Sequence, residues 1–201
     1  MKINAQRDSL VKAINTAESV ISARNINTLL SNCLFRVGKD EIEIIATDNE
    51  VAIRTRIEAV SDGEGAFTVN GKKLSGILKE LPNDEIVLQI NNNFAVDIRS
   101  KSKDVKGHYN LIGISADEYP EIPLFHENNS HEIEQTVLKE MIRKVMYAAS
   151  TDTIKPVFNG IYMTADEKGS LSLVATDSRR LSLITRSMEN AIDMQEGVIL
   201  P

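Results

Sequence analysis

Three segments repeat their apolar residues every three or four positions, which is the spacing of an amphipathic α-helix. In residues 6–24, Leu10, Ile14 and Ile21 share one side of the helix, and Lys12 lies on the opposite side. The other two segments cover residues 71–80 and 135–150. Their apolar positions are Leu74, Ile77, Leu78 and Leu81, and Leu138, Met141, Ile142, Val145 and Ala149. The pattern therefore predicts three helices.

Between these segments, apolar and polar residues alternate with the period of two that is typical of β-strands. In the run EVAIRTRI, for example, Val51, Ile53 and Ile57 share a face and Arg54 points the other way. The remaining runs of this kind are CLFRV, EIEIIAT, GAFTVN, GHYNLIGI, HEIEQ, and EIVLQI with FAVDIRS, which form a hairpin around Asn91–Asn93. We expect antiparallel strands with one buried face, and hence an α+β fold.

The chain contains an internal duplication. The phrase ATD begins at Ala46 and again at Ala175, 129 residues later, and the first and third helical segments align at an offset of 128. Each copy divides again into two βαβββ half-units, although the second copy stops where the first enters its second helix. We expect a first domain at 1–122, a linker at 123–130 within a Pro-rich and acidic stretch from about 115 to 130, and an incomplete second domain at 131–201. The chain thus reads as a fragment.

Charge is distributed unevenly in this acidic protein. The formal net charge is −6, yet each of the three helical segments carries more lysine and arginine than acid. Such separation would steer a polyanion to one surface, although amphipathic helices also favour lysine and arginine on any solvent-exposed side. The single cysteine, Cys33, falls in a strand and is expected to be buried. No signal peptide or long apolar run is present, so we expect a cytoplasmic protein.

Five motifs in order along the chain carry a specific likeness. They are MKINAQRDSLVKAI, SARNINTLLSN, ATDNEVAIRTRI, SADEYPEIP, and FNGIYM followed by VATDSRRLSL. Together they resemble the bacterial sliding clamps, the beta subunits of DNA polymerase III. The resemblance implies a DNA clamp fold, with antiparallel sheets outside and helices on one, pore-facing side. It also implies three domains per chain, of which the third is absent here. Two full-length chains would close a ring around duplex DNA, and a fragment is not expected to close a normal ring.

The resemblance also implies two sets of site residues. A clamp slides by weak, numerous contacts to phosphates without reading the bases. The residues placed to make such contacts are Arg7, Lys12, Arg24, Lys72, Lys73, Lys139, Arg143 and Lys155. A groove on the second domain would bind short peptides of the replicative polymerase, the clamp loader and repair proteins. Its residues would be Phe158, Thr176, Ser178, Arg179, Arg180 and Leu181, with Ser178 standing where a glycine is common.

Other interpretations remain open at the level of sequence. An enzyme would depend on Asp48 or Asp177, but each lies at a strand end, where aspartate commonly bonds to turn backbone. The three histidines have no metal-ligand spacing, so neither a metal nor another cofactor is expected. The protein could instead be an interaction module without a DNA role, and the SRRL run could be a charge pair on a solvated strand end. The salt dependence of DNA binding distinguishes a clamp from an interaction module without a DNA role.

Overall fold

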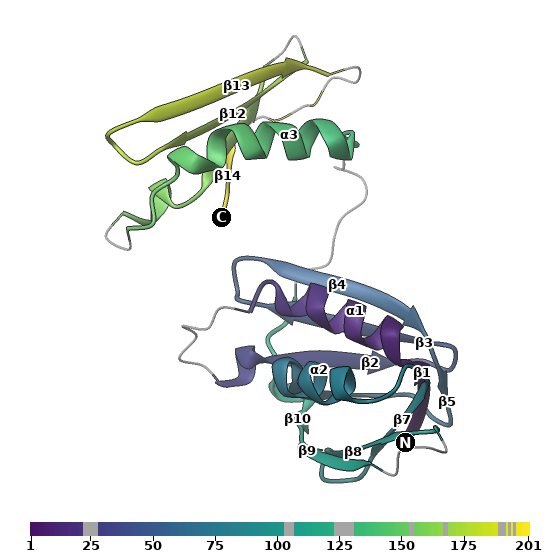
Figure 1. Ribbon diagram of the computed structural model, residues 1–201. Coiled ribbons are helices and arrows are strands. Elements are labelled where there is room, and N and C mark those ends of the chain that lie inside the picture. The colour runs from purple at the N-terminus through teal and green to yellow at the C-terminus, as the bar shows by residue number, and fades with distance from the viewer. Residues whose placement is uncertain are drawn as a thin grey trace. The chain divides into compact units, whose positions relative to one another are not determined.

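The computed structural model describes residues 1–21, 28–102, 107–122, 131–152, 155–166, 169–188, 192, 194 and 196–201. The chain forms two compact units, Met1–Pro123 (unit 1) and Leu124–Pro201 (unit 2) (Figure 1). Each unit is described by itself.

The described residues of unit 1 form two five-stranded antiparallel sheets and two α-helices. The first sheet has the order β5-β1-β7-β8-β9 and the second has the order β10-β6-β2-β3-β4. The strands are β1 Lys2–Gln6, β2 Asn32–Val37, β3 Glu41–Thr47, β4 Ala52–Glu58, β5 Val60–Ser61, β6 Gly65–Asn70, β7 Glu85–Ile90, β8 Ala95–Ser100, β9 His108–Ile112 and β10 Ile114–Ser115. The helices are α1 Arg7–Glu18 and α2 Gly71–Glu80, with short 3-10 turns η1 Thr28–Ser31 and η2 Ala116–Glu118.

The two half-units of unit 1 exchange their first strands. Strand β1 begins the first half-unit but pairs with β7 of the second, for example Ile3 with Leu88. Strand β6 begins the second half-unit but pairs with β2 of the first, for example Phe67 with Phe35. Each sheet therefore draws strands from both halves of the sequence, and neither half can form its sheet alone.

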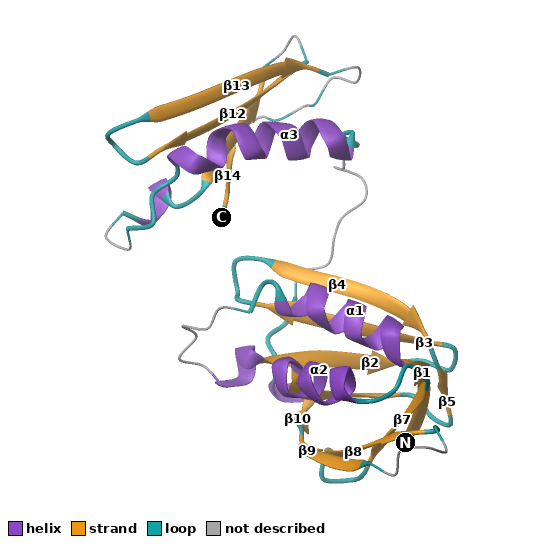
Figure 2. Cartoon of the chain, in the orientation of Figure 1, coloured by secondary structure: helices purple, strands orange, loops and turns teal. Residues whose placement is uncertain are grey.

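The core of unit 1 lies between the helices and the two sheets. Leu10 and Ile14 of α1 and Leu74 and Leu78 of α2 are fully buried in one cluster with the inward residues of the strands. Each such side chain contributes about 1.5–3 kcal/mol by leaving water. A side chain at Gly71 would place its Cβ 2.6 Å from the Cys33 sulfur, so α2 must begin on glycine to pack this closely. Figure 2 shows α1 and α2 side by side on unit 1.

The burial of Cys33 is confirmed, but the expectation that strands have one buried face is wrong for β2 and β3. Cys33 is completely buried. On the face of the second sheet that points away from the helices, Leu34 and Ile45 form a separate small core with Tyr119. Residues 116–122 cover this face and belong to unit 1. The Tyr119 hydroxyl donates a hydrogen bond to the backbone oxygen of Asn32 at 3.2 Å.

The run GHYNLIGI forms two strands where one was expected. The chain leaves β9 of the first sheet at Gly113 and enters β10 of the second sheet. The Gly113 N–H donates to the Phe94 oxygen at 3.0 Å, and a Cβ at Gly113 would lie 2.4 Å from that same oxygen. Glycine therefore permits the crossing from one sheet to the other.

Unit 2 repeats half of this design. The sheet of unit 2, here called the third sheet, has the order β13-β12-β11-β14. This order matches β4-β3-β2-β6 of the second sheet strand for strand. Figure 2 shows α3 across β12 and β13, and Met141 and Val145 of this helix are fully buried against that sheet. The elements are α3 Gln135–Val145, η4 Met146–Ala148, η5 Pro156–Phe158, β11 Ile161–Ala165, β12 Ser170–Thr176, β13 Leu181–Ser187 and β14 Val198–Leu200.

The strand expected for HEIEQ is not formed. Residues 131–134 have no regular structure, and α3 begins at Gln135. In unit 1 the equivalent strand β1 is held between β7 and β5, but within the described part of unit 2 no strand corresponds to β7. Alternation without a partner strand does not form a sheet. None of the described helices is long and apolar enough to cross a membrane.

Candidate functional site

Exposed lysines line the solvent side of the two helices of unit 1. Lys12 on α1 and Lys72 and Lys73 on α2 are exposed. Between the helices, the buried Ser75 hydroxyl donates to the Asn15 side-chain oxygen at 2.8 Å and links α1 to α2. None of the ion pairs between described residues involves these three lysines. Their charges are therefore available to an anionic partner.

Lys79 also belongs to this surface, although it was not among the candidate residues for DNA binding. It is exposed in the last turn of α2. Burial raises the pKa of Glu18 at the end of α1, and the positive charges of Lys79 and Lys72 oppose that rise. The segment's positive charge was visible in the sequence, but the contact between the two helices that gathers Lys79 with Lys72 was not.

Arg7 has a structural role that the sequence did not indicate. Its Nε donates to the backbone oxygen of Leu78 at 3.0 Å, and Nη2 donates to the oxygen of Lys79 at 3.1 Å. Its Nη1 forms an ion pair with Asp8 at 2.6 Å, and the side chain is only 21% exposed. The guanidinium thus caps carbonyl groups at the C-terminus of α2, where the helix dipole favours a cation. Among the described candidates of unit 1, Arg7 has the fewest donors left for a ligand.

A shallow cavity of about 360 Å³ lies beside Lys12, between α1 and the edge strand β4. Its lining includes Lys12 and Arg56, the hydroxyl-bearing side chains of Ser9 and Thr55, and one acid, Glu58. The Arg56 Nε pairs with Glu43 at 3.2 Å, on the same face of β4 as Arg54. Of the two cations, Lys12 is therefore the one without an ion-pair partner among the described residues.

On unit 2, the two candidates of α3 differ from their basic neighbour. Lys139 and Arg143 are exposed and four residues apart, and within the described residues neither is ion-paired. Lys144 instead pairs with Glu140 at 2.6 Å, and Glu140 also contacts Arg186 at 3.3 Å. These cations hold the pKa of Glu140 below its ordinary value, with Lys144 as the main cause. Lys139 and Arg143 therefore carry the available charge of α3.

Two further candidates stand apart from the helices. Arg24 lies outside the described residues. Lys155 directly precedes η5, and its ammonium group lies 5.6 Å from the centre of the Phe158 ring, within the range of a cation–π contact. Lys155 is thus associated with the candidate peptide groove through Phe158.

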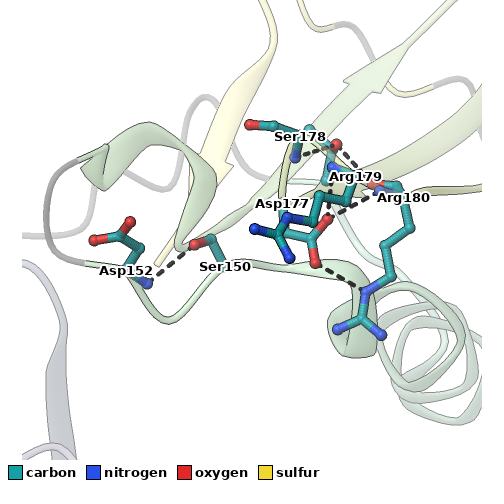
Figure 3. A network of polar contacts seen from close by, with 7 residues as sticks. Ser150, Asp152, Asp177, Ser178, Arg179 and Arg180 are labelled. Carbon is teal, nitrogen blue, oxygen red and sulfur yellow. Dashed lines mark hydrogen bonds and ion pairs between the residues drawn. The ribbon is translucent and has the colours of Figure 1, made fainter.

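Thr176, Asp177, Ser178, Arg179 and Arg180 form a tight turn between β12 and β13 (Figure 3). The Asp177 carboxylate accepts hydrogen bonds from the backbone N–H groups of Arg179 at 3.0 Å and Arg180 at 2.9 Å. The Thr176 hydroxyl donates to the Arg180 oxygen at 2.7 Å and accepts from the Ser178 N–H at 3.2 Å. The two backbone bonds hold the pKa of Asp177 below its ordinary value. The turn is therefore rigid and presents Arg179 to solvent.

The first ATD phrase builds the same turn in unit 1. There Asp48 accepts from the N–H groups of Glu50 and Val51, and the Thr47 hydroxyl bonds to the Val51 oxygen at 2.8 Å. The residue after the aspartate adopts a left-handed backbone in both copies, with φ of 79° at Asn49 and 75° at Ser178. This explains why a glycine suits position 178. The expectation that Asp48 and Asp177 make turn hydrogen bonds is confirmed.

Apolar and aromatic groups gather at this end of the third sheet. Leu181, the first residue of β13, is 64% exposed, and the half-buried Phe158 leads into β11 at the same end of the sheet. The Arg180 guanidinium pairs with Asp177 at 3.0 Å and lies 5.7 Å from the centre of the Tyr147 ring. The charge pair considered for the SRRL run therefore exists, and it leaves Leu181 and Arg179 exposed. Tyr147 was not among the sequence candidates because it lies in a 3-10 turn outside every motif.

The comparisons with known proteins agree with this architecture along the whole chain. The family model for the DNA polymerase III beta subunit, N-terminal domain, matches residues 1–123, and the model for its central domain matches residues 132–201. The chain belongs to the family of DNA polymerase III beta subunits, the bacterial sliding clamps.

Individual relatives support the family assignment. The chain is 28% identical to the beta sliding clamp of Bacillus subtilis over 100% of its own length and 54% of the relative. It is 30% identical to that of Synechococcus elongatus over 95% of this chain and 50% of the relative. The crystal structure of the Bartonella birtlesii sliding clamp bound to griselimycin matches 100% of this chain and 54% of its own, with a TM-score of 0.90 and 27% identity. The α+β clamp fold is thereby confirmed, and the chain spans about half the length of these relatives.

Proposed function

We propose that the chain is part of a DNA polymerase processivity factor, a non-enzymatic clamp that encircles duplex DNA and tethers proteins to it. The observation that carries this proposal is the match of both family models, in order, over nearly all of the chain. Ring closure by two chains is proposed for the full-length architecture of the relatives, of which this chain spans about half.

In this proposal the DNA surface consists of exposed cations on the helices. Lys12, Lys72 and Lys73 of unit 1 and Lys139 and Arg143 of unit 2 are exposed and have no ion-pair partner among the described residues. Flexible lysines make point contacts with phosphates and do not read base edges, which suits a protein that slides. An overall charge of −6 keeps the rest of the surface unattractive to DNA.

Binding of the 201-residue chain to duplex DNA should be weak, independent of sequence and strongly dependent on salt. Each neutralised phosphate contributes about −0.9 to the slope of log K against log salt concentration. A triple variant with Lys12→Gln, Lys72→Gln and Lys73→Gln should therefore reduce the slope by about two to three. Fluorescence anisotropy with two unrelated duplexes at several salt concentrations measures this.

A matched control removes the same charge elsewhere on unit 1. Lys2, Lys39 and Lys101 are exposed, and none lies on a helix. Their replacement by glutamine should leave the slope close to that of the unaltered chain. Equal losses in both triple variants, or binding that ignores salt and prefers one sequence, would refute the helix surface and favour an interaction module without a DNA role.

The second part of the proposal is a groove for short peptides at Phe158 and the 176–181 turn. The exposed Leu181 and half-buried Phe158 offer apolar contacts, and Arg179 adds a cation at the rim. Such a surface suits an extended peptide with a Leu or Phe anchor from the replicative polymerase, the clamp loader or repair proteins. Phe158→Ala should weaken binding of such a peptide in a titration, whereas Val60→Ala, at an exposed site of unit 1, should not. Equal binding by both variants would exclude Phe158 from the groove.

A further inference from the structure

The outer face of the second sheet, which points away from α1 and α2, carries a compact group of charges. Arg36 on β2, Glu43 on β3 and Arg56 on β4 lie in one cross-strand row. Arg54 lies on the same face, two residues before Arg56. These three arginines and Glu43 are here called the arginine cluster.

A single carboxylate holds the arginine cluster together. The Glu43 Oε1 atom lies 3.2 Å from Nε of Arg56 and 3.4 Å from Nε of Arg54. Its Oε2 atom lies 3.5 Å from Nη1 of Arg36. The Glu43 side chain is only 11% exposed, whereas those of Arg36 and Arg56 are 51% and 60% exposed. Three guanidinium groups share one carboxylate, so two of their positive charges are not neutralised within the cluster.

The cluster also has hydrogen-bond donors to spare. Arg54 and Arg56 both contact Glu43 through Nε, and no hydrogen bond or ion pair between described residues uses their terminal nitrogens. A guanidinium group presents its N–H donors in a plane, in a spacing that matches the oxygens of a phosphate group. The cluster can therefore bind an anion without breaking its contacts to Glu43.

The fold does not require these charges. In the third sheet, the equivalent row on β11, β12 and β13 consists of Thr164, Ser172 and Thr185. The Ser172 and Thr185 hydroxyl groups are hydrogen-bonded at 2.8 Å. The same strand order is thus formed with a neutral row. Because a buried ion pair is often no more stable than neutral residues in its place, stability alone does not explain the arginine cluster.

The charge and size of the cluster select the ligand. A phosphorylated serine or threonine carries a charge of about −1.5 to −2 at pH 7 and has three acceptor oxygens, which matches two unneutralised positive charges. The phosphates of DNA carry one charge each and are spread along a strand, so they match a compact cluster less well. The open face of a sheet also lacks the concave shape that encloses a small molecule.

We propose that the arginine cluster binds the phosphoryl group of a phosphorylated serine or threonine in a segment of a partner protein. Arginine clusters are a recurring means of recognising such groups. The cluster points away from the helices that carry the proposed DNA surface, and it belongs to unit 1, whereas the proposed peptide groove belongs to unit 2. The site therefore depends on neither of them.

The test uses the 201-residue chain, labelled with nitrogen-15, at constant ionic strength and about pH 7.5. The ligands are inorganic phosphate and a short peptide with one phosphoserine between glycine and alanine residues. The Nε–H signals of Arg54 and Arg56 should shift, with a Kd of about 0.5–10 mM for an exposed site of this charge. The peptide with serine should cause no shift. Binding of the phosphopeptide should weaken severalfold at about pH 5, because its phosphoryl group takes up a proton near pH 6.

Protein variants identify the surface. The triple variant Arg36→Thr, Glu43→Ser and Arg56→Thr copies the neutral row of the third sheet, so no buried carboxylate is left unpaired. It loses one net positive charge and should bind phosphopeptide at least about tenfold more weakly. Arg99→Thr loses the same net charge at an exposed position of the first sheet and should bind normally. Arg56→Lys keeps the charge without the planar donors and should bind severalfold more weakly. Circular dichroism checks that the sheets are intact.

Four results would overturn the proposal. The first is the absence of any shift with either ligand at about 20 mM, twice the upper end of the expected range. The second is a shift with inorganic phosphate but not with phosphopeptide, which would assign the cluster to free phosphate. The third is an oligonucleotide without terminal phosphate that binds the cluster more tightly than the phosphopeptide, in favour of DNA. The fourth is an equal loss of binding in Arg99→Thr and the triple variant, which would indicate unspecific attraction by net charge.

Discussion

Arg7 allows the clearest separation between a structural and a DNA-binding role. Its side chain makes two hydrogen bonds to the carbonyls of Leu78 and Lys79 and one to Asp8. In Arg7→Lys the positive charge remains, but a single ammonium cannot bridge the two carbonyls in the geometry of the planar guanidinium. We therefore expect a loss of stability with little loss of DNA affinity.

The size of the loss follows from the bonds that are removed. A hydrogen bond to a charged group contributes about 1.5–3 kcal/mol when it is well buried. The Arg7 side chain is 21% exposed, and water can reach part of the helix end. For the two carbonyl bonds together we expect about 1–2 kcal/mol after this screening. With a urea dependence of about 1–3 kcal/mol per molar, the unfolding midpoint of unit 1 should fall by about 0.3–2 M.

Cys33 provides a probe of unit 1 alone, because it is the only cysteine of the chain and is buried in that unit's core. Labelling of its thiol at increasing urea concentrations follows the unfolding of unit 1 without interference from unit 2. Lys12→Met is the matched control, since it removes an exposed cation of the same helix and should change stability by less than about 0.5 kcal/mol. An Arg7→Lys chain with unchanged stability and weakened DNA binding would show that the capping argument is wrong.

Three further outcomes are expected. The Cys33 thiol, whose pKa burial raises to about 12, should not react with iodoacetamide at pH 8 in native protein but should react rapidly in urea, as a mass shift would show. Ser178→Gly should stabilise unit 2 by about 0.5–1 kcal/mol in thermal unfolding, because φ at this residue is 75°; a destabilised variant would contradict this. The folded pKa of Asp177 lies below its ordinary 3.8, so its stabilisation is complete above that pH and is lost as the pH falls through the lowered value. Asp177→Asn should accordingly reduce the acid dependence of unit 2 unfolding below about pH 4, and an unchanged pH profile would count against the turn bonds.

Local chemistry explains which parts of the fold could be predicted from the sequence. The helices that contain Leu10, Leu74 and Met141 have strong apolar periodicity, and their buried residues match it. The two ATD turns carry their own hydrogen-bond partners within five residues, so the repeated phrase was enough to predict them. In both cases the determining contacts are close in sequence.

Predictions failed where a distant segment supplies the contact. Alternation in β2 and β3 indicated one buried face, but residues 116–122 cover the other face with Tyr119, which is 87 residues away from its hydrogen-bond partner Asn32. The stretch from about 115 to 130 has no periodicity, so the contact of Tyr119 with this sheet could not be predicted from the sequence. Arg7 was placed among the DNA contacts by the family resemblance, and that role stays a prediction. Its capping of a helix end 71 and 72 residues further along the chain could not be predicted from the sequence.

The comparison of the two copies separates residues that the fold requires from residues that are free to change. Both copies have a threonine and an aspartate that form the turn, and both have apolar helix residues that form the core. Loss of the first pair would remove the turn, and loss of the apolar residues would remove the core. The solvent-facing positions diverge: Glu50 corresponds to Arg179, and Arg54 corresponds to Leu183 on the edge strand. The first copy thus has an acid and a cation at the positions where the second has a cation and an exposed leucine. Because the turns at these positions make the same hydrogen bonds, the difference between the copies lies in the charge and the apolar surface that each exposes.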